Sequence, residues 1–435
     1  MKGVAVDRRD LLRAAARAAV AGALAGRPAG GLTRSTTRYA ALERLLEEMV
    51  AGGEVPGGAV AVVRPGRFRP DVIAFGRTVF AGGAPVSGRT LFRIYSMTKP
   101  LTGIAVMQAV AAGRMTLDTP LGALLPEFGR MQVLIDPQAG LAARPAERPI
   151  LVRHLLTHTA GFTYHIAGDG PLEREYRRQG LLPIGSLGLG LSRDDGPVPD
   201  LDGFVSRLAA LPLYAEPGTV YRYSVSLDLA GGLLQRLAGR PFDQLLEAQL
   251  LGPLGMRDTG FTVPESAFGR LSALYAWVDP ETGARRAEPL LADAPPETAW
   301  AKPSPLPAGG AGLVSSAEDY ARFAQMLLNQ GLFEGRRILP AGLARLAMSN
   351  LMPPGVFYQK IHGYGAGGSV TLADTRATGP EGQPPGVFGW GGAAGTLFQV
   401  DPVRDVAVVL MLQHLPAQAF PTARRFATAA NRDFG

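Results

Sequence analysis

The chain has 435 residues, of which 46% are hydrophobic and 19% charged, a balance typical of a globular protein and not of a disordered one. Cysteine is absent, which excludes disulfides, thiol catalysis and cysteine-ligated metals. The formal net charge is +7, but the basic residues are mainly arginines spread along the chain without a basic block, so we expect a solvated surface and no nucleic-acid binding.

The N-terminal segment differs from the rest of the chain. The pair Arg8-Arg9 precedes an alanine-rich stretch, and Ala23–Ala25 has the small-x-small form of a cleavage site. This order is typical of a twin-arginine export signal over residues 1–25 and predicts a periplasmic or secreted protein, although Arg17 interrupts the apolar stretch. The alternative is an amphipathic N-terminal helix on a cytoplasmic protein. Beyond this segment no apolar run of about 18 residues occurs, so we expect no stable membrane insertion.

Folded sequence is expected to begin near residue 37. Tyr39–Val50 has helical spacing and is followed by two glycines that end the helix. Gly58–Val63 and Val72–Val79 predict two strands joined by a turn rich in proline and glycine. From about residue 100 to residue 310 the chain predicts mainly helices and long loops.

Within and beyond that region a few elements are distinct. Residues 182–198 predict a loop, and Leu229–Gly239 predicts a helix that stops at its glycine. Gly395–Val400 and Asp405–Leu412 predict two strands separated by a turn, and a final helix is expected over Thr422–Asn431.

Strands near both ends with helices between them predict one sheet assembled from the two termini. The folded region, residues 37–430, is expected to be a single domain. Its sheet part is expected over residues 37–95 and 310–430, and its helical subdomain over residues 96–309.

The tetrapeptide Ser96–Lys99 carries the candidate chemistry. Leu101–Ala112 is helical in pattern and Pro100 is tolerated only in a first turn, so the helix is expected to start at about Ser96. That start places the serine hydroxyl at the positive end of the helix, with Lys99 one turn on and on the same face. A serine is a poor nucleophile unless a neighbouring base takes its proton. On spacing alone, an N-cap serine beside a surface lysine is an equal alternative.

The surrounding sequence resembles the class C β-lactamase-related serine hydrolases, and among them the family VIII carboxylesterases. The stretches that match this group, in order, are Thr90–Pro100, Leu151–Phe162, Glu216–Val225, Leu251–Phe261 and Gly309–Tyr320. The resemblance implies an α/β (α+β) fold of the β-lactamase/transpeptidase type, an antiparallel sheet flanked by helices plus a mostly helical subdomain. It also implies Ser96 as nucleophile, Lys99 and Tyr223 as its proton-handling partners, and an oxyanion hole formed by the backbone N–H groups of Ser96 and Ala393.

The third motif of the group separates its members. Where the β-lactamases carry Lys-Thr-Gly on a sheet strand, this sequence reads Trp390-Gly391-Gly392, as in family VIII esterases. The usual asparagine of the tyrosine motif is Val225. We expect these four residues to contact the substrate, and both changes favour a neutral apolar ester over an acidic β-lactam. A core tryptophan and a plain glycine bulge are the alternatives.

Other motifs are weaker. His154 and His158 lie one helical turn apart, but the glutamate of the zinc-protease helix is missing, so we interpret them as structural and expect no metal. Gly363–Gly368 has the glycine spacing of a dinucleotide loop, but a strand-like segment follows it where a helix is required. No Gly-x-Ser-x-Gly elbow occurs, which argues against an α/β-hydrolase.

Together these features predict a serine carboxylesterase that hydrolyses or transacylates small neutral esters through an acyl-enzyme, with no metal or organic cofactor. A β-lactamase or D-amino-acid peptidase of the same fold is the alternative among enzymes. A non-catalytic binding protein is the alternative from another class, and the joint presence of Ser96, Lys99 and Tyr223 argues against it. The oligomeric state stays open.

Overall fold

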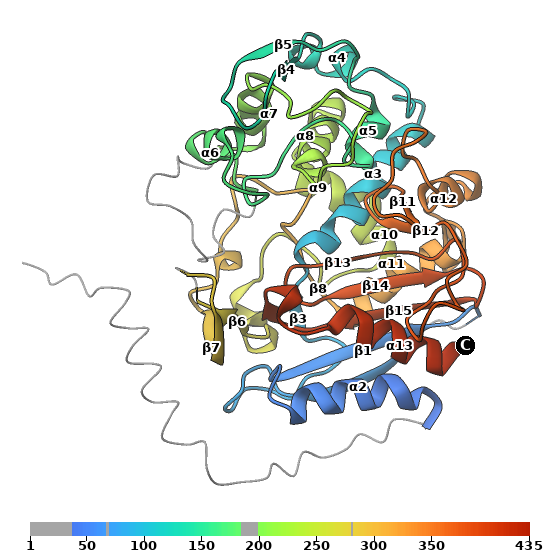
Figure 1. The fold of residues 1–435 in the computed structure, drawn as a ribbon. Coiled ribbons are helices and arrows are strands. Elements are labelled where there is room, and N and C mark those ends of the chain that lie inside the picture. The colour runs from blue at the N-terminus through green and yellow to red at the C-terminus, as the bar shows by residue number, and fades with distance from the viewer. Residues whose placement is uncertain (1–36, 67–68, 184–198, 280–281) are drawn as a thin grey trace, which may run out of the picture.

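The computed structural model describes residues 37–66, 69–183, 199–279 and 282–435. The expected export signal and nearly all of the expected loop over residues 182–198 lie outside these ranges, so both stay predictions. No helix within the described ranges is long and apolar enough to cross a membrane. A central antiparallel sheet carries helices on its faces, and a mainly helical part is stacked above it (Figure 1).

The central sheet has seven strands in the order β11-β12-β13-β14-β15-β1-β2, and all neighbouring pairs are antiparallel. The strands are β1 (Gly57–Val63), β2 (Asp71–Gly76), β11 (His362–Tyr364), β12 (Ser369–Thr371), β13 (Phe388–Gly391), β14 (Leu397–Asp401) and β15 (Val406–Met411). Strands β1 and β15 pair side by side, with Ala59 opposite Met411 and Val63 opposite Ala407. The two ends of the chain therefore build one sheet, which confirms the prediction.

Helices cover both faces of this sheet. On one face lie α2 (Ala40–Ala51) and α13 (Thr422–Phe434), which pack against each other, and on the other lies α11 (Ala317–Leu328). The remaining helices are α3 (Thr98–Ala111), α4 (Leu121–Leu124), α5 (Val152–Leu156), α6 (Pro171–Arg178), α7 (Leu201–Ala209), α8 (Ser226–Ala238), α9 (Phe242–Leu246), α10 (Gly252–Leu254) and α12 (Ala341–Ala347).

Side chains of β1 alternate between two hydrophobic cores, because successive residues of a strand point to opposite faces of a sheet. Ala59, Ala61 and Val63 belong to the larger core, which continues into the helical part, whereas Val60 and Val62 belong to the core beneath α2 and α13. The strand is buried on both faces. That burial explains why its sequence is an unbroken apolar run that could be recognised as a strand.

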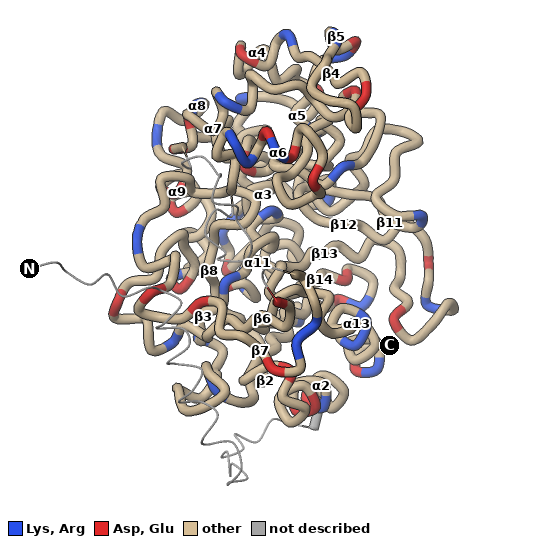
Figure 2. The backbone as a smooth tube through the Cα atoms, turned by 60° about the vertical axis from the view of Figure 1, so that its left-hand side comes forward, with Lys and Arg blue, Asp and Glu red and all other residues tan. Residues whose placement is uncertain are grey.

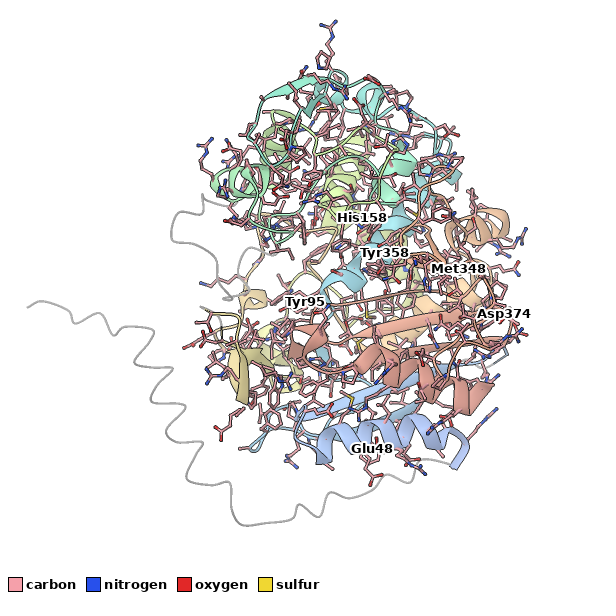
Figure 3. The ribbon with its side chains drawn as sticks, in the orientation of Figure 1. Glu48, Tyr95, His158, Met348, Tyr358 and Asp374 are labelled. Atoms are coloured by element: carbon pink, nitrogen blue, oxygen red, sulfur yellow. The ribbon has the colours of Figure 1, made fainter. Side chains whose placement is uncertain are left out.

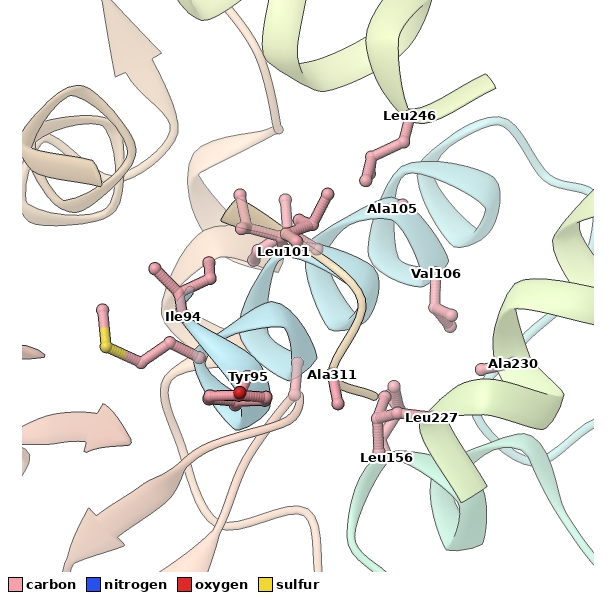
Figure 4. Close-up of a cluster of buried hydrophobic side chains, with 14 of the residues drawn as sticks. Ile94, Tyr95, Leu101, Ala105, Val106, Leu156, Leu227, Ala230, Leu246 and Ala311 are labelled. Carbon is pink, nitrogen blue, oxygen red and sulfur yellow. The ribbon is translucent and has the colours of Figure 1, made fainter. Parts of the chain in front are cut away.

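Helix α3 runs through the centre of the molecule. Its residues from Thr98 to Met107 are all buried, and it packs against α8 on one side and α12 on the other. Figure 4 shows the hydrophobic cluster around it, to which α5 contributes Leu156 and α8 contributes Leu227 and Ala230. A helix that is apolar all round belongs in a core. The segment that leads into α3 is therefore held at a fixed place between the sheet and the helical part.

Among the described residues, four strands occur inside the range where mainly helices and loops were expected. β4 (Gln132–Leu134) and β5 (Ala143–Pro145) pair with each other beside the helices of that part. β6 (Leu274–Val278) and β7 (Arg285–Asp293) form a small sheet with β16 (His414–Leu415), which follows β15, so they lie beside the sheet part of the fold (Figure 1). Most residues of β7 are exposed or half-buried and include Pro289, so no apolar alternation indicates a strand. Strand β6 is too short to be distinguished from a helical segment by its pattern.

Charged side chains of both signs are interspersed over the described part of the molecule, as Figure 2 shows along α6. On that helix Arg178 pairs with Glu175 at 2.6 Å, and on α8 Arg236 pairs with Asp202 at 2.8 Å. Pairs of this kind keep a surface solvated but contribute little to stability.

The packing of α3 predicts that Gly103→Ala destabilises the protein. A Cβ atom at Gly103 would overlap the backbone carbonyl of Ala366, which cannot move aside as a flexible side chain can. Overpacking of this kind costs about 1–3 kcal/mol of unfolding free energy, which urea denaturation measures. Gly342→Ala is the matched control, because that helical glycine in α12 has nothing near its missing Cβ and alanine favours helix. Equal stability of the two variants would contradict this account.

Candidate active site

Ser96 lies in a single 3₁₀ turn, η2 (Tyr95–Met97), directly before α3. The observed α-helix begins two residues later than expected, and the serine is still at its entrance. Tyr95 has a φ of +40°, an uncommon value for a residue with a side chain, and its buried ring packs edge-on against Trp300 at 5.7 Å. A strained backbone of this kind persists only where the surroundings hold it, and here they fix the serine beside it.

The structure brings together the three predicted catalytic residues. The Tyr223 hydroxyl donates a hydrogen bond to Ser96 Oγ at 2.7 Å, and Lys99 Nζ donates to the same oxygen at 3.3 Å. Lys99 Nζ also lies 4.5 Å from the centre of the Tyr223 ring. Ser96 is 9% exposed and Lys99 is completely buried. One serine oxygen therefore has two groups in reach that can exchange protons with it.

A buried carboxyl group that the sequence analysis missed lies behind Lys99. Lys99 Nζ donates to the Gly310 carbonyl at 2.7 Å, and the N–H of the same glycine donates to Asp228 Oδ1 at 2.7 Å. Asp228 is fully buried in α8, and this burial raises its pKa to about 6, although the charge of Lys99 acts in the opposite direction. A lone aspartate within the apolar stretch Leu227–Ala230 is the signal that could have indicated it.

The predicted oxyanion donor Ala393 lies in a turn between β13 and β14. Gly392 N–H bonds to Thr396 O at 2.8 Å and Gly395 N–H bonds to Gly392 O at 3.1 Å, so Ala393 occupies the second position of this turn. The N–H at that position is not used by the turn itself. Gly392 lies so close to the Ile94 carbonyl that a Cβ atom would overlap it, which places the turn beside the segment that carries the serine.

Ser96, Tyr223 and Ala393 open on one cavity of about 680 Å³. Trp390, Gly391 and Gly392 line it as well, and the Trp390 ring lies 5.9 Å from that of Tyr223. The described residues that form its wall include no Asp, Glu, Lys or Arg. The cavity is therefore walled by apolar, aromatic and neutral polar groups.

Val225 differs from its predicted role as a substrate contact. The side chain is completely buried in the larger core, at the start of α8, and it is not part of the cavity wall. Its position two residues after the predicted catalytic tyrosine made it a candidate, but the chain turns into α8 at this residue and the side chain is buried. Val225 therefore packs in the core and does not face a ligand.

The two motif histidines are both buried. His154 Nδ1 accepts the Leu151 N–H at 3.1 Å, and His158 Nδ1 accepts the Ser224 N–H at 3.2 Å. Burial lowers the pKa of His154 to about 4. Across the described ranges no group of three or more His, Asp or Glu side chains is arranged to hold a metal ion.

A serine at a helix entrance, bonded to a lysine one turn on and to a tyrosine from a distant segment, defines a serine hydrolase of the β-lactamase-like class. The chain belongs to the Beta-lactamase family, whose family model matches residues 42–432. It is 35% identical over 374 residues to protein Rv1367c of Mycobacterium tuberculosis, covering 82% of this chain and 86% of the relative.

Two further comparisons concern proteins whose names state an activity. Esterase EstB of Burkholderia gladioli is 31% identical over 382 residues, which cover 86% of this chain and 89% of the esterase. The solved structure of EstCE1, described as a hydrolase with promiscuous acyltransferase activity, is 25% identical, with a TM-score of 0.68 over 90% of this chain and 98% of its own. The fold implied by the resemblance is thereby confirmed.

The buried carboxyl group gives a prediction for Asp228→Asn, which keeps an oxygen acceptor for the Gly310 N–H and removes the titration. The folded pKa of about 6 lies above the ordinary value of 3.8, so the unfolded chain releases this proton first as the pH rises. The ionisation of Asp228 therefore leaves the unfolding free energy unchanged below about pH 4. It lowers the unfolding free energy progressively as the pH rises through about 6. We expect the unfolding free energy of the variant, relative to the native protein, to rise by about 2 kcal/mol between those pH values.

Urea denaturation at both pH values, followed by tryptophan fluorescence, measures this difference. A stability difference that is the same at both pH values would show that the Asp228 carboxyl titrates normally in the folded protein.

Proposed function

We propose that this protein is a serine carboxylesterase that hydrolyses or transacylates small neutral esters through an acyl-enzyme on Ser96. The observation that carries the proposal is that Ser96 Oγ, bonded to Tyr223 and Lys99, opens on a cavity without charged side chains. The similarity to esterase EstB and to the hydrolase EstCE1 supports the same class of reaction.

The reaction has two steps. Ser96 Oγ attacks the ester carbonyl while its proton passes to the Lys99–Tyr223 pair, and the N–H groups of Ser96 and Ala393 stabilise the oxyanion. The alkoxide then leaves with a proton from the pair, and the acyl group stays on the serine. Water, or a second alcohol in transacylation, gives its proton to the same pair and attacks the acyl carbonyl. The bond to Ser96 Oγ then breaks, the pair returns the proton to that oxygen, and the acid or new ester is released.

The wall of the cavity favours a neutral substrate. Trp390 offers an aromatic surface at the position where a cation would be needed to bind a carboxylate. A carboxylate that enters a site without a cation loses hydration and gains no ion pair in return. A β-lactamase or D-amino-acid peptidase, the alternative among enzymes, must bind such a group. A non-catalytic binding protein would have no use for a serine bonded to both Lys99 and Tyr223.

The nucleophile is tested with Ser96→Ala. We expect the variant to fold and to lose ester hydrolysis completely, because it removes the hydroxyl that Tyr223 and Lys99 both bond. Mass spectrometry of the native protein quenched during turnover of a p-nitrophenyl ester should find the acyl group on the peptide that contains Ser96. An adduct on a different serine, or turnover by Ser96→Ala at the native rate, would refute the proposal.

The preference for neutral substrates is tested with pairs of p-nitrophenyl esters that differ only in a carboxylate on the acyl chain. The missing ion pair is worth about 1.5–3 kcal/mol, so we expect kcat/KM to fall by about 10- to 150-fold for the charged ester. Trp390→Lys should narrow this gap, and Trp390→Phe, the control that keeps an uncharged ring, should not. Cephalosporin hydrolysis as fast as that of the best ester would favour the β-lactamase alternative.

A further inference from the structure

Tyr223 lies on an irregular part of the chain. Residues 220–224 belong to no helix or strand, yet the hydroxyl of Tyr223 is 2.7 Å from Ser96 Oγ. Proton transfer needs a donor and an acceptor held within hydrogen-bond reach, and a displacement of about 1 Å can cost about 10²-fold in rate. Other contacts must therefore hold this tyrosine in place.

His158 makes contacts with the chain on both sides of Tyr223. The Arg222 N–H donates to the His158 carbonyl at 2.9 Å, and the Ser224 N–H donates to His158 Nδ1 at 3.2 Å. The imidazole ring itself packs on the Tyr223 ring, with 4.6 Å between the ring centres. One residue thus fixes the backbone before the tyrosine, the backbone after it and one face of its ring.

The conformation and charge state of His158 suit this role. Its φ is +54°, a left-handed value that few residues with side chains adopt, and the side chain is completely buried (Figure 3). Burial lowers the pKa of the imidazole well below its usual range, and the charge of Lys99 lowers it further. The ring is therefore neutral, so Nδ1 can accept the Ser224 N–H, and no second cation is placed next to Lys99.

We propose that His158 is the positioning residue of the proton path, which acts on catalysis by holding Tyr223 against Ser96. This inference rests on the proposed esterase function and deepens it. His158 is not itself among the residues that line the cavity, and no hydrogen bond joins it to Ser96 Oγ. Its ring also packs on Tyr364 at 5.4 Å, so the test must isolate the effect that passes through Tyr223.

A double-mutant cycle tests the inference. His158→Ala should lower kcat for a neutral p-nitrophenyl ester by about 10- to 100-fold and leave KM within about twofold, because binding does not use Tyr223 as a proton carrier. In the Tyr223→Phe background the same substitution should lower kcat by less than about twofold. Equal losses in the two backgrounds, or no loss in either, would overturn the inference.

Two further variants separate positioning from general damage to the fold. His158→Asn tolerates a positive φ and keeps an acceptor near the position of Nδ1, so it should fold and recover part of the kcat lost in His158→Ala. If His158→Ala does not fold, His158→Asn replaces it in the double-mutant cycle with Tyr223→Phe. His154→Ala is the matched control, a buried histidine whose Nδ1 bonds to the Leu151 N–H, and it should leave kcat within about twofold.

The same experiment distinguishes failure of the inference from failure of the proposed function. Native turnover by Tyr223→Phe would remove the tyrosine from the mechanism and refute that part of the proposed function. A strong loss in Tyr223→Phe together with native kcat in His158→Ala would leave the function in place and refute the inference.

Discussion

A completely buried lysine nitrogen constrains the centre of this structure. Removing Lys99 from water is costly unless its nitrogen finds hydrogen-bond partners, and it finds them in Ser96 Oγ and the Gly310 carbonyl. Gly310 is held on both sides of its Cα, because its N–H donates to Asp228 and its carbonyl accepts from the lysine. A Cβ atom at Gly310 would lie 2.6 Å from Asp228 Oδ2, so any larger residue here would have to displace the buried carboxyl group. Hydrogen bonds thus connect Ser96 and Lys99 at the entrance of α3 to Gly310, and Gly310 to the carboxyl group of Asp228 in α8.

Much of the fold could be predicted because its central strands are buried on both faces. The expected strands Gly58–Val63 and Asp405–Leu412 match β1 and β15 within one residue at each end, since an unbroken apolar run marks such a strand. Strand β7 lacked that signal because its residues are mostly accessible to solvent. Ser96 and Lys99 could be placed together because residues three apart at the entrance of a helix lie on the same face.

The contacts that organise the site could not be predicted in the same way. Asp228 meets Gly310 across 82 residues of sequence and His158 meets Ser224 across 66, and no local periodicity encodes such pairs. Val225 shows the opposite error, because proximity to a motif in sequence suggested a ligand contact, whereas the start of α8 turns the side chain into the core. Sequence pattern indicates which residues are chemically capable, and the fold decides which of them meet.

The groups around Ser96 have unequal mechanical support. Lys99 belongs to a helix buried in the core, and Ala393 belongs to a turn between two strands of the sheet. Tyr223 has no such framework, and the residues beside it are anchored instead. Arg222 pairs with Glu173 of α6 at 2.6 Å, while Ser224 is held by His158.

Arg222 and Ser224 therefore form these bonds with residues of the helical part. Tyr223, which lies between them, directs its hydroxyl to Ser96. Segments with few regular backbone hydrogen bonds open at lower free energy than helices and strands. The geometry of the proton path thus depends on a small number of side-chain contacts in the helical part, and the position of the nucleophile depends on the packed core of the whole domain.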